Sequence, residues 1–298
     1  MKNDDRIPRL GFRPPDGYAF DIEIFPANDW LKRVPADHFR YPSRLDFHQL
    51  ILVTQGRFRH TVDFQLASIR TGALLAMRPG QVQHFEVNKP WDGWVVIFQP
   101  ESFQSVHGVG GRPSGLSVDD IPVQLPLGRT SFDAVRKGMA QMHHDALLGG
   151  HMQLVGALER FQLQALLIRL LLASEQQHAL PATDSSLARH FRKFRDAAEK
   201  RFHECHQVST YASAVGISEK TLGRATQEMA GLSAKAYLSQ RIALEAKRML
   251  AYTDWPVASV ADKLGFDEAT NFIKFFRREA GYAPGEFRKQ HRDPESRL

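Results

Sequence analysis

The chain has 298 residues, with 39 Lys and Arg against 33 Asp and Glu and a single cysteine, Cys205. Its net charge of +6 suits an anionic partner, and its length suggests two domains. One cysteine excludes an intramolecular disulfide framework and a thiolate zinc site. No apolar run approaches the ~20 residues of a membrane span, and the first residues lead into no apolar segment. We therefore expect no signal peptide, no membrane partner and a cytoplasmic protein.

Short strands dominate the first third of the chain. Residues 1–20 are polar and carry prolines, and a strand pattern begins near Asp21 and continues to about Gln99. Apolar or alternating runs bounded by Gly and Pro turns are typical of a sandwich or barrel. The expected strands are 20–25, 47–54, 58–64, 73–77 and 94–98, with Gly56 between the second and third.

A long Gly- and Pro-rich loop, residues 102–127, separates these strands from two expected helices, 131–148 and 151–175. The second helix has apolar residues at alternating spacings of four and three, the spacing of a coiled-coil seam. The seam consists of Leu154, Leu158, Phe161, Ala165, Ile168 and Leu172. A second stripe (Leu163, Leu166, Leu167, Leu170) widens the apolar face. One stripe can pack inside the subunit while the seam meets a second subunit; alternatively, both stripes are buried within the monomer.

Residues 176–186 contain Pro181 and small polar residues, so we expect an inter-domain linker there, followed by a basic helix to about His203. Residues 184–298 carry 20 Lys and Arg against 15 Asp and Glu, so most of the net charge lies in this segment. This asymmetry favours nucleic acid as the anionic partner.

Two copies of one short pattern lie in this basic segment. In each copy an alanine is followed four residues later by a glycine, Gly216 or Gly265, and the two glycines are 49 residues apart. Next come an apolar residue and a candidate helix N-cap, Ser218 or Asp267. Apolar anchors for the following helices are Leu222 and Phe272. This order of residues predicts a helix-turn-helix motif in each copy. The alternative is an ordinary small helical domain.

Residues 234–252 read as one amphipathic helix between the two motifs. A helix of about 18 residues spans about 27 Å. Such a helix could hold two reading helices about one DNA turn, ~34 Å, apart on one face of a duplex.

These residues resemble the DNA-binding domain of the AraC/XylS transcription regulators. The likeness is carried by Gly265-Phe266, by the run from Phe275 to Arg288 and by the linker from Arg241 to Leu250. Asn271 stands where that family usually has an aromatic residue, and Ala225-Thr226 replaces an apolar-aromatic pair. The resemblance implies double-stranded DNA and RNA polymerase as partners, a homodimer, and activation as the commoner outcome.

A recognition helix presents its N-terminal half to base edges. In both motifs the outward positions predict DNA contacts, with Arg224 the best candidate for a bidentate pair to guanine and Asn271 for adenine. Lys274 and Arg277 suit phosphates equally well. The predicted DNA-binding residues are Glu219, Lys220, Thr221, Arg224, Glu268, Ala269, Thr270, Asn271, Lys274 and Arg277.

The strand region resembles the cupin-like sensor domain of many AraC-type regulators, through the run from Phe47 to Gly56 and the residues from Gly72 to Asn88. Metal-binding cupins need several His and carboxylate ligands, but here only His48 and a displaced His84 remain, with Leu52 at the glutamate position. We therefore expect no metal and no cofactor. The resemblance implies that Arg78, His84, Trp91 and Trp94 lie near the usual barrel mouth, and His48 is a polar residue in an apolar strand. These five are the candidate effector-binding residues.

The sequence thus predicts a two-domain regulator: a mostly β, cupin-like barrel with a helix pair, then an all-α domain with two helix-turn-helix units joined by a long helix. We expect a sensing domain over 1–130, a dimerisation segment over 131–175, the linker over 176–186 and the DNA-binding domain over 187–292. A small-molecule effector in the barrel is the leading hypothesis for control. The alternatives are control by a protein partner without an effector and, third, a metal-dependent cupin enzyme with a DNA-binding tail. We expect no catalytic residues, since no nucleophile-base pair or phosphate loop stands out.

Overall fold

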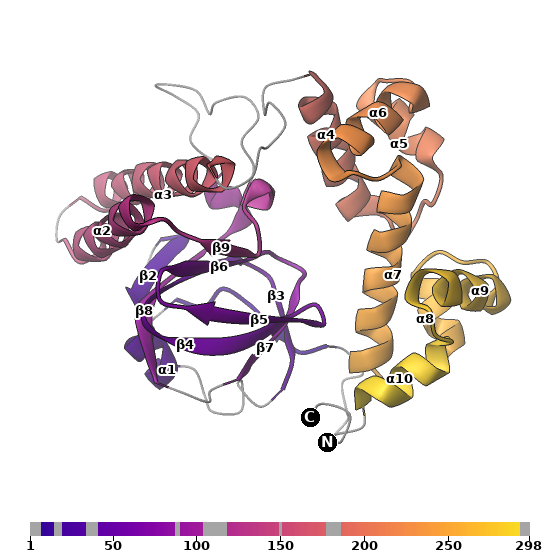
Figure 1. Ribbon diagram of the computed structural model, residues 1–298, viewed down its shortest axis with the longest axis horizontal. Coiled ribbons are helices and arrows are strands. Elements are labelled where there is room, and N and C mark those ends of the chain that lie inside the picture. Colours follow the sequence, from indigo (N-terminus) through magenta and orange to yellow (C-terminus); the bar gives the residue numbers. More distant parts are fainter. Residues whose placement is uncertain are drawn as a thin grey trace. The chain divides into compact units, whose positions relative to one another are not determined.

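A computed structural model of the chain describes residues 7–14, 20–33, 41–86, 90–103, 118–148, 151–176 and 186–292. The chain divides into two compact units (Figure 1). We call Pro8–Ala179 the barrel unit, and we call the unit that contains Leu180–Leu298 the helical unit. Each unit is described by itself.

The barrel unit is built on one long strand, β4 (His48–Val62). Its first half pairs antiparallel with β6 and β8, and its second half pairs with β5 and β7, so two sheets share this strand. The other strands are β1 (Arg9–Leu10), β2 (Ile22–Pro26), β3 (Ser43–Leu45), β5 (Gln65–Arg70), β6 (Ala73–Met77), β7 (Val82–Glu86), β8 (Trp91–Phe98) and β9 (Gln124–Pro126). β2 borders β8 and β9 borders β6 in one sheet, while β1 and β3 extend the other beyond β7.

Gly56 does not end a strand, so the expected division into strands 47–54 and 58–64 is wrong. The chain passes from one sheet to the other at this residue, which takes a φ of 81°. A β-carbon at Gly56 would lie 2.6 Å from the carbonyl oxygen of Pro90, so only glycine allows β4 to lie this close to the start of β8. The expected strand 73–77 is confirmed as β6.

The expected loop over 102–127 is corrected in its described part. Residues 104–117 lie outside the described residues. The 3-10 helices η2 (Pro100–Phe103) and η3 (Val118–Asp120) border that stretch, and β9 pairs antiparallel with β6 at the edge of its sheet. The apolar residues Val118, Ile121 and Leu125 are buried and pack on the core, which an exposed loop would not achieve.

Two separate apolar cores lie on the two faces of the β4–β6–β8 sheet. Between the sheets, the interior core is rich in aromatic rings: Trp30, on α1 (Ala27–Arg33), Phe58, Phe85 and Trp91 have ring centroids 4.6–6.3 Å apart. Outside, the sheet is covered by α2 (Arg129–Ala146) and α3 (Met152–Glu175), which bury the second stripe of α3. Figure 1 shows this helix pair lying against one side of the barrel.

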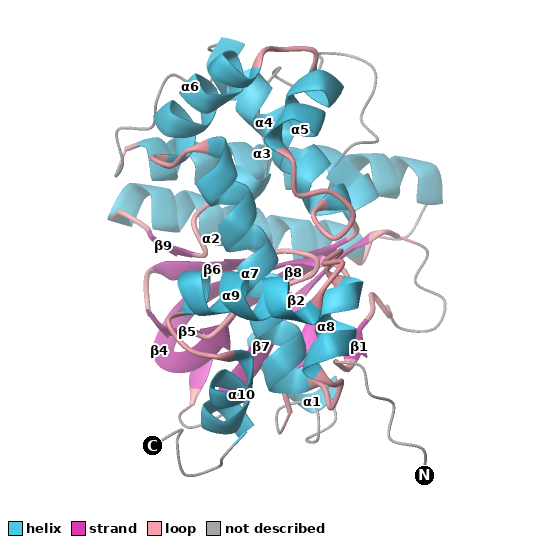
Figure 2. Cartoon of the chain, turned by 90° about the vertical axis from the view of Figure 1, so that its right-hand side faces the viewer, coloured by secondary structure: helices cyan, strands magenta, loops and turns pink. Residues whose placement is uncertain are grey.

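The helical unit consists of seven helices in its described residues. They are α4 (Ser186–Arg201), α5 (Val208–Val215), α6 (Glu219–Ala230), α7 (Ala234–Tyr252), α8 (Val257–Lys263), α9 (Ala269–Ala280) and α10 (Pro284–Arg292). α7 matches the expected helix 234–252 and runs between the α4–α6 group and the α8–α10 group (Figure 2).

We predict that Gly56→Ala lowers the free energy of unfolding by about 2–4 kcal/mol, because the new methyl group meets both the positive φ and the Pro90 carbonyl. Gly72→Ala is the matched control: its φ is 86°, but nothing lies within 4 Å of the place its new methyl group would take, so only backbone strain of about 1–2 kcal/mol is expected. Urea denaturation of the full chain measures both. Equal losses in the two variants would contradict the close approach at Gly56.

Candidate nucleic-acid interface and sensor unit

The first helix-turn-helix unit consists of α5, a tight turn and α6. Gly216 ends α5 in the left-handed conformation, with a φ of 76°. Two residues later the Ser218 hydroxyl accepts a hydrogen bond from the Thr221 backbone N–H at 3.2 Å and so caps α6. The expected roles of this glycine and this serine are confirmed.

The second unit, α8 and α9, turns at Gly265 with the same φ of 76°. A β-carbon at Gly265 would lie 2.5 Å from the carbonyl oxygen of His203, so this glycine also permits close backbone contact. The expected N-cap Asp267 is wrong: Glu268 occupies the N-cap of α9 and makes no side-chain cap bond. One residue of extra turn therefore precedes α9, and the Glu268 carboxylate instead accepts a hydrogen bond from the Thr270 hydroxyl at 3.0 Å.

Buried anchors fix the rotation of both reading helices. Leu222 and Phe272, the expected anchors, are completely buried, as is Phe276 one turn further along α9. Thr226 is also buried, and its hydroxyl donates to the carbonyl oxygens of Leu222 and Gly223. The Ala225-Thr226 pair thus packs in α6 without an unsatisfied polar group. Because the buried side is fixed, the opposite side of each helix faces solvent.

The predicted DNA-binding residues lie on those solvent-facing sides. Thr221 and Ala269 are half-buried. The exposed members are Glu219, Lys220, Arg224, Glu268, Thr270, Asn271, Lys274 and Arg277. The Thr221 hydroxyl lies 3.0 Å from that of Ser218, so it belongs to the cap of α6 and is less available for a base.

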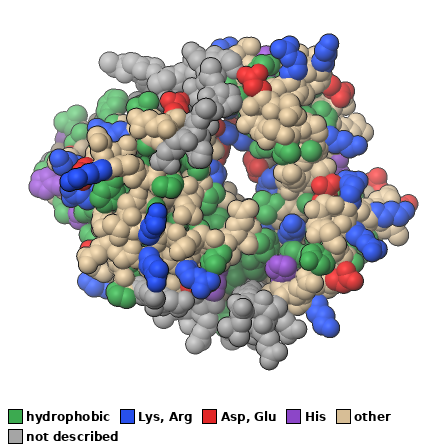
Figure 3. Space-filling view, viewed as in Figure 1, with side chains coloured by type: hydrophobic (Ala, Val, Ile, Leu, Met, Phe, Trp, Pro, Cys, Tyr) green, Lys and Arg blue, Asp and Glu red, His purple; other side chains and the backbone are tan. Residues whose placement is uncertain are grey.

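The cationic members of this set are not neutralised by carboxylates. Lys220, Arg224, Lys274 and Arg277 make no ion pair in the described part of the chain, whereas the neighbouring Arg278 pairs with Glu279 at 2.8 Å. Figure 3 shows basic side chains projecting from the surface of the helical unit. Unpaired cations on two solvent-facing helices form a surface suited to a polyanion.

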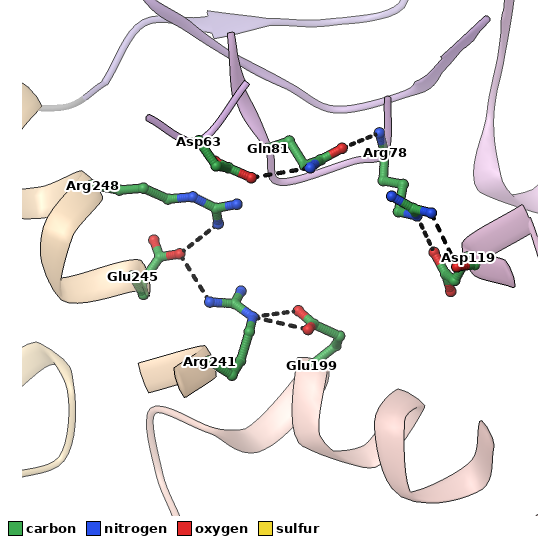
Figure 4. Close-up of polar contacts among 8 residues, drawn as sticks. All are labelled: Asp63, Arg78, Gln81, Asp119, Glu199, Arg241, Glu245 and Arg248. Atoms are coloured by element: carbon green, nitrogen blue, oxygen red, sulfur yellow. Dashed lines mark hydrogen bonds and ion pairs between the residues drawn. The ribbon is translucent and has the colours of Figure 1, made fainter. Parts of the chain in front are cut away.

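An ion network on α7 joins this helix to α4, next to the first helix-turn-helix unit. The Arg241 guanidinium donates through Nε to both carboxylate oxygens of Glu199 on α4, at 2.9 and 2.8 Å, and stacks over the Phe202 ring at 3.9 Å. Arg241 also meets the buried Glu245, which Arg248 contacts at 2.8 Å (Figure 4). In the second half, the Arg288 guanidinium donates to the carbonyl oxygens of Leu250 and Trp255, which ties α10 to the end of α7.

The predicted effector residues do not converge. Strand alternation places His48 on the outer face of the sheet with Leu50 and Leu52, where it stacks on Phe98 at 4.8 Å. Burial lowers the pKa of His48 to about 4, which nearby Asp119 opposes and Arg78 favours. Arg78 is held by the Asp119 carboxylate at 3.1 Å and by the Asp119 and Ile121 carbonyl oxygens, so it clamps the chain that precedes β9 (Figure 4).

The remaining members of the predicted set are also divided between the two faces. Trp94 lies outside the barrel, packed against the α2–α3 core and 5.4 Å from the His143 ring. Trp91 lies inside, in the aromatic core. His84 precedes Phe85 on β7 and therefore faces away from the interior that Phe85 enters. Only Trp91 of the five is an interior residue.

His60 and Gln83 are interior polar residues that were not singled out from the sequence. His60 is completely buried between Phe58 and Phe85, and Gln83 is buried nearby. Within the described residues, neither ring nitrogen of His60 makes a hydrogen bond, nor does Gln83 Oε1 or Trp91 Nε1, although Gln83 lies close enough to favour the charged form of His60. The sequence does contain a pattern from which His60 could have been found: residues 58–62 alternate, which places His60 on the same face as Phe58 and Val62.

No group of three or more His, Cys, Asp or Glu side chains in the described residues is arranged to hold a metal ion. Among the described helices, none is long and apolar enough to cross a membrane.

The seam expected on α3 points away from the barrel core. Leu154, Leu158, Phe161 and Leu172 are between 38% and 72% exposed, and Ala165 and Ile168 are partly buried. The second stripe, by contrast, is fully buried. A row of large apolar side chains left in water is unusual for a subunit that acts alone.

The fold and the exposed helices α6 and α9 together define the class of a DNA-binding protein with a β-barrel unit and two helix-turn-helix motifs. An "AraC-like ligand binding domain" matches residues 31–191, and a "Helix-turn-helix domain" matches residues 211–290. The chain belongs to the AraC family of transcription regulators. The AraC family consists of regulators rather than enzymes, which confirms the expectation that this chain is a regulator and not an enzyme.

Several relatives and solved structures are similar to this chain. The transcriptional activator RhaS of Enterobacter sp. (strain 638) is 26% identical over 82% of this chain and 86% of its own length. RhaS of Escherichia fergusonii is 24% identical over 90% of this chain and 95% of its own. The DNA-binding domain of AdpA, solved with a target DNA, is 28% identical over 37% of this chain and 95% of its own, with a TM-score of 0.32. ToxT of Vibrio cholerae O395 is 8% identical over 83% of this chain and 90% of its own, with a TM-score of 0.41.

We predict that His60 makes the barrel unit sensitive to acid. Burial, helped by the nearby His84, lowers the pKa of His60 from 6.5 to about 3. Between these two pH values His60 is protonated in the unfolded chain and neutral in the folded chain. The stability that neutral His60 contributes is present above pH 6.5 and falls by about 1.4 kcal/mol per pH unit as the pH drops below it. Urea denaturation of wild type and His60→Leu between pH 8 and 4 measures this.

The two curves should run parallel between pH 7 and 8, where the histidine is neutral in both states, and diverge below pH 6.5 with the shallower slope in His60→Leu. Parallel curves throughout would contradict the lowered pKa of His60.

Proposed function

We propose that this chain is a transcription activator that reads duplex DNA through α6 and α9. The observation that carries the proposal is the pair of helices whose apolar sides are buried while their cations, unpaired within the described residues, face solvent. α7 has 19 residues and so spans about 28 Å, which suits two neighbouring major-groove segments about one turn apart. Relatives described as activators support activation and, with it, contact with RNA polymerase. A DNA partner also supports the expected cytoplasmic location.

The direct test is a selection of bound sequences from random duplex DNA with the full chain at a stated salt concentration. Two short boxes about one helical turn apart, repeated once for a second subunit, are expected. A single box, or enrichment without any motif, would contradict a bipartite reader.

Within this proposal Arg224 pairs with a guanine edge. We predict that Arg224→Ala costs about 1–3 kcal/mol at one base position and relaxes the preference there, as measured by affinities for a set of single-base variants of the selected site. Arg278→Ala is the matched control, because Arg278 is an exposed arginine on a reading helix that already pairs with Glu279. A uniform loss across all sequences would instead make Arg224 a phosphate contact.

We further propose that the exposed seam of α3 joins two copies of the chain. The seam is continuous along the helix, and its residues lie opposite the stripe that α3 buries on its own barrel. An isologous contact between two such helices removes both apolar rows from water.

Phe161→Glu is therefore expected to convert a dimer into a monomer in sedimentation-velocity runs, because it places a charge in the centre of the seam. Leu66→Glu is the matched control: Leu66 is 52% exposed on β5, close to the 51% of Phe161, yet lies outside the seam. A dimer that survives Phe161→Glu would move the interface elsewhere.

For control of activity we propose a small-molecule effector that reaches the barrel interior. Buried polar atoms on His60, Gln83 and Trp91 that lack partners among the described residues support it, because a ligand would supply the missing hydrogen bonds. Of the five effector-binding residues expected from the sequence, this proposal keeps only Trp91. Control by a protein partner is the second candidate, favoured by the close aromatic packing of Trp30, Phe58 and Phe85.

A thermal-shift screen of sugars, organic acids and aromatic compounds against the full chain separates the two. We expect at least one compound to raise the melting temperature of wild type but not of Gln83→Leu, which removes an interior amide at nearly constant volume. If no compound in any class acts on wild type, the protein-partner alternative is the better account.

A further inference from the structure

Two arginines face each other on the outer side of the β4–β5 hairpin. The register of this antiparallel pair places Arg57 directly opposite Arg70, and both side chains are exposed. Directly opposed residues have β-carbons about 4.5–5.5 Å apart, and like charges at that spacing destabilise the pair. The hairpin therefore contains a local repulsion that nothing in strand formation requires.

No carboxylate relieves this repulsion within the described residues, where neither Arg57 nor Arg70 forms an ion pair. Arg59, two residues along on the same face of β4, does have a partner, since its guanidinium lies 3.5 Å from Glu86. The two opposed arginines thus remain available to an anion from outside the chain.

A surface cavity of about 470 Å³ lies at this position, open to solvent and lined by Gly56, Arg57, Arg70, Thr71 and Pro90. Its volume falls within the roughly 300–1,000 Å³ usual for small-molecule sites. Several Lys and Arg side chains of the barrel unit lie over β4 and β5 in the view of Figure 3.

The backbone around the cavity is firmly held. The Gly56 carbonyl oxygen accepts hydrogen bonds from the Thr71 backbone N–H at 3.0 Å and from its hydroxyl at 3.1 Å. The close approach of Gly56 to Pro90 fixes the other wall. The two strands that carry Arg57 and Arg70 are thus held at a fixed spacing, which lowers the entropy lost when one ligand contacts both side chains.

We propose that this cavity binds a small molecule through a phosphate or carboxylate group held between Arg57 and Arg70. Guanidinium groups bind either oxyanion in bidentate fashion, and a bound anion would remove the repulsion between the two side chains. The site is distinct from the proposed effector contacts, because Arg57 alternates with Phe58, whose ring enters the barrel interior.

The test is calorimetric titration of the full chain with inorganic phosphate, pyrophosphate and citrate, at constant ionic strength so that general screening cancels. Saturable binding of at least one anion is expected, with affinity reduced tenfold or more in Arg57→Gln and in Arg70→Gln. A preference for pyrophosphate identifies a phosphate ligand, and a preference for citrate identifies a polycarboxylate.

Arg9→Gln is the matched control. It makes the same charge change in the barrel unit, at an exposed arginine on β1 that already contacts Asp46 at 3.5 Å and does not line the cavity. It should leave anion affinity unchanged. Melting temperatures check the fold: each cavity variant should melt no lower than wild type in the absence of ligand, since losing one of two opposed charges removes repulsion.

The absence of saturable binding by all three anions would overturn the proposal, as would equal binding to wild type and to the double variant that combines Arg57→Gln with Arg70→Gln. A loss of duplex-DNA affinity in the double variant without any change in anion binding would also overturn it, because the arginines would then be contacts to the DNA backbone.

Discussion

A glycine in the left-handed conformation sets the geometry on which the DNA-reading unit depends. At Gly216 and Gly265 the chain reverses within a few residues, so that a second helix starts at a defined angle to the first. The completely buried Leu222 and Phe272 then fix the rotation of α6 and α9 about their axes. Once angle and rotation are fixed, the exposed side of each helix follows. Arg224 and Asn271 face solvent because the opposite sides are fully occupied by packing.

Charged side chains of this protein fall into two groups within the described residues. On α7, the buried Glu245 and Arg248 pair with each other, and Arg241 extends the network to α4. These charges are satisfied inside the protein and hold helices together. The cations on the reading helices have no such partners within the described residues and are left for an outside anion. The opposed Arg57 and Arg70 of the barrel unit resemble the second group rather than the first.

The barrel unit separates two functions by strand alternation. In the first half of β4, His48 and Leu50 face the α2–α3 pair while Ile51 faces the interior. The register shift between Val53 and Gln55 exchanges the faces, so that Phe58 and His60 face the interior in the second half. α3 in turn buries one stripe on that outer face and exposes the seam beginning at Leu154. The same sheet thus connects the interior proposed for an effector, through the helix pair, to the surface proposed for a second subunit.

The sequence by itself determined the double helix-turn-helix unit, its linking helix and the two-unit organisation, because helix periodicity, glycine turns and Ser218 act within a few residues of one another. Tertiary structure alone decided what long-range pairing controls. Gly56 lies within strand β4, where it packs against the backbone of Pro90, a residue from a distant segment of the chain. His48 and Arg78 do not line the expected effector site, because His48 stacks on Phe98 and Arg78 pairs with Asp119. His60 instead lies in the aromatic core. A one-residue change of register exchanges the two faces of a strand, and no local pattern specifies which face becomes the interior.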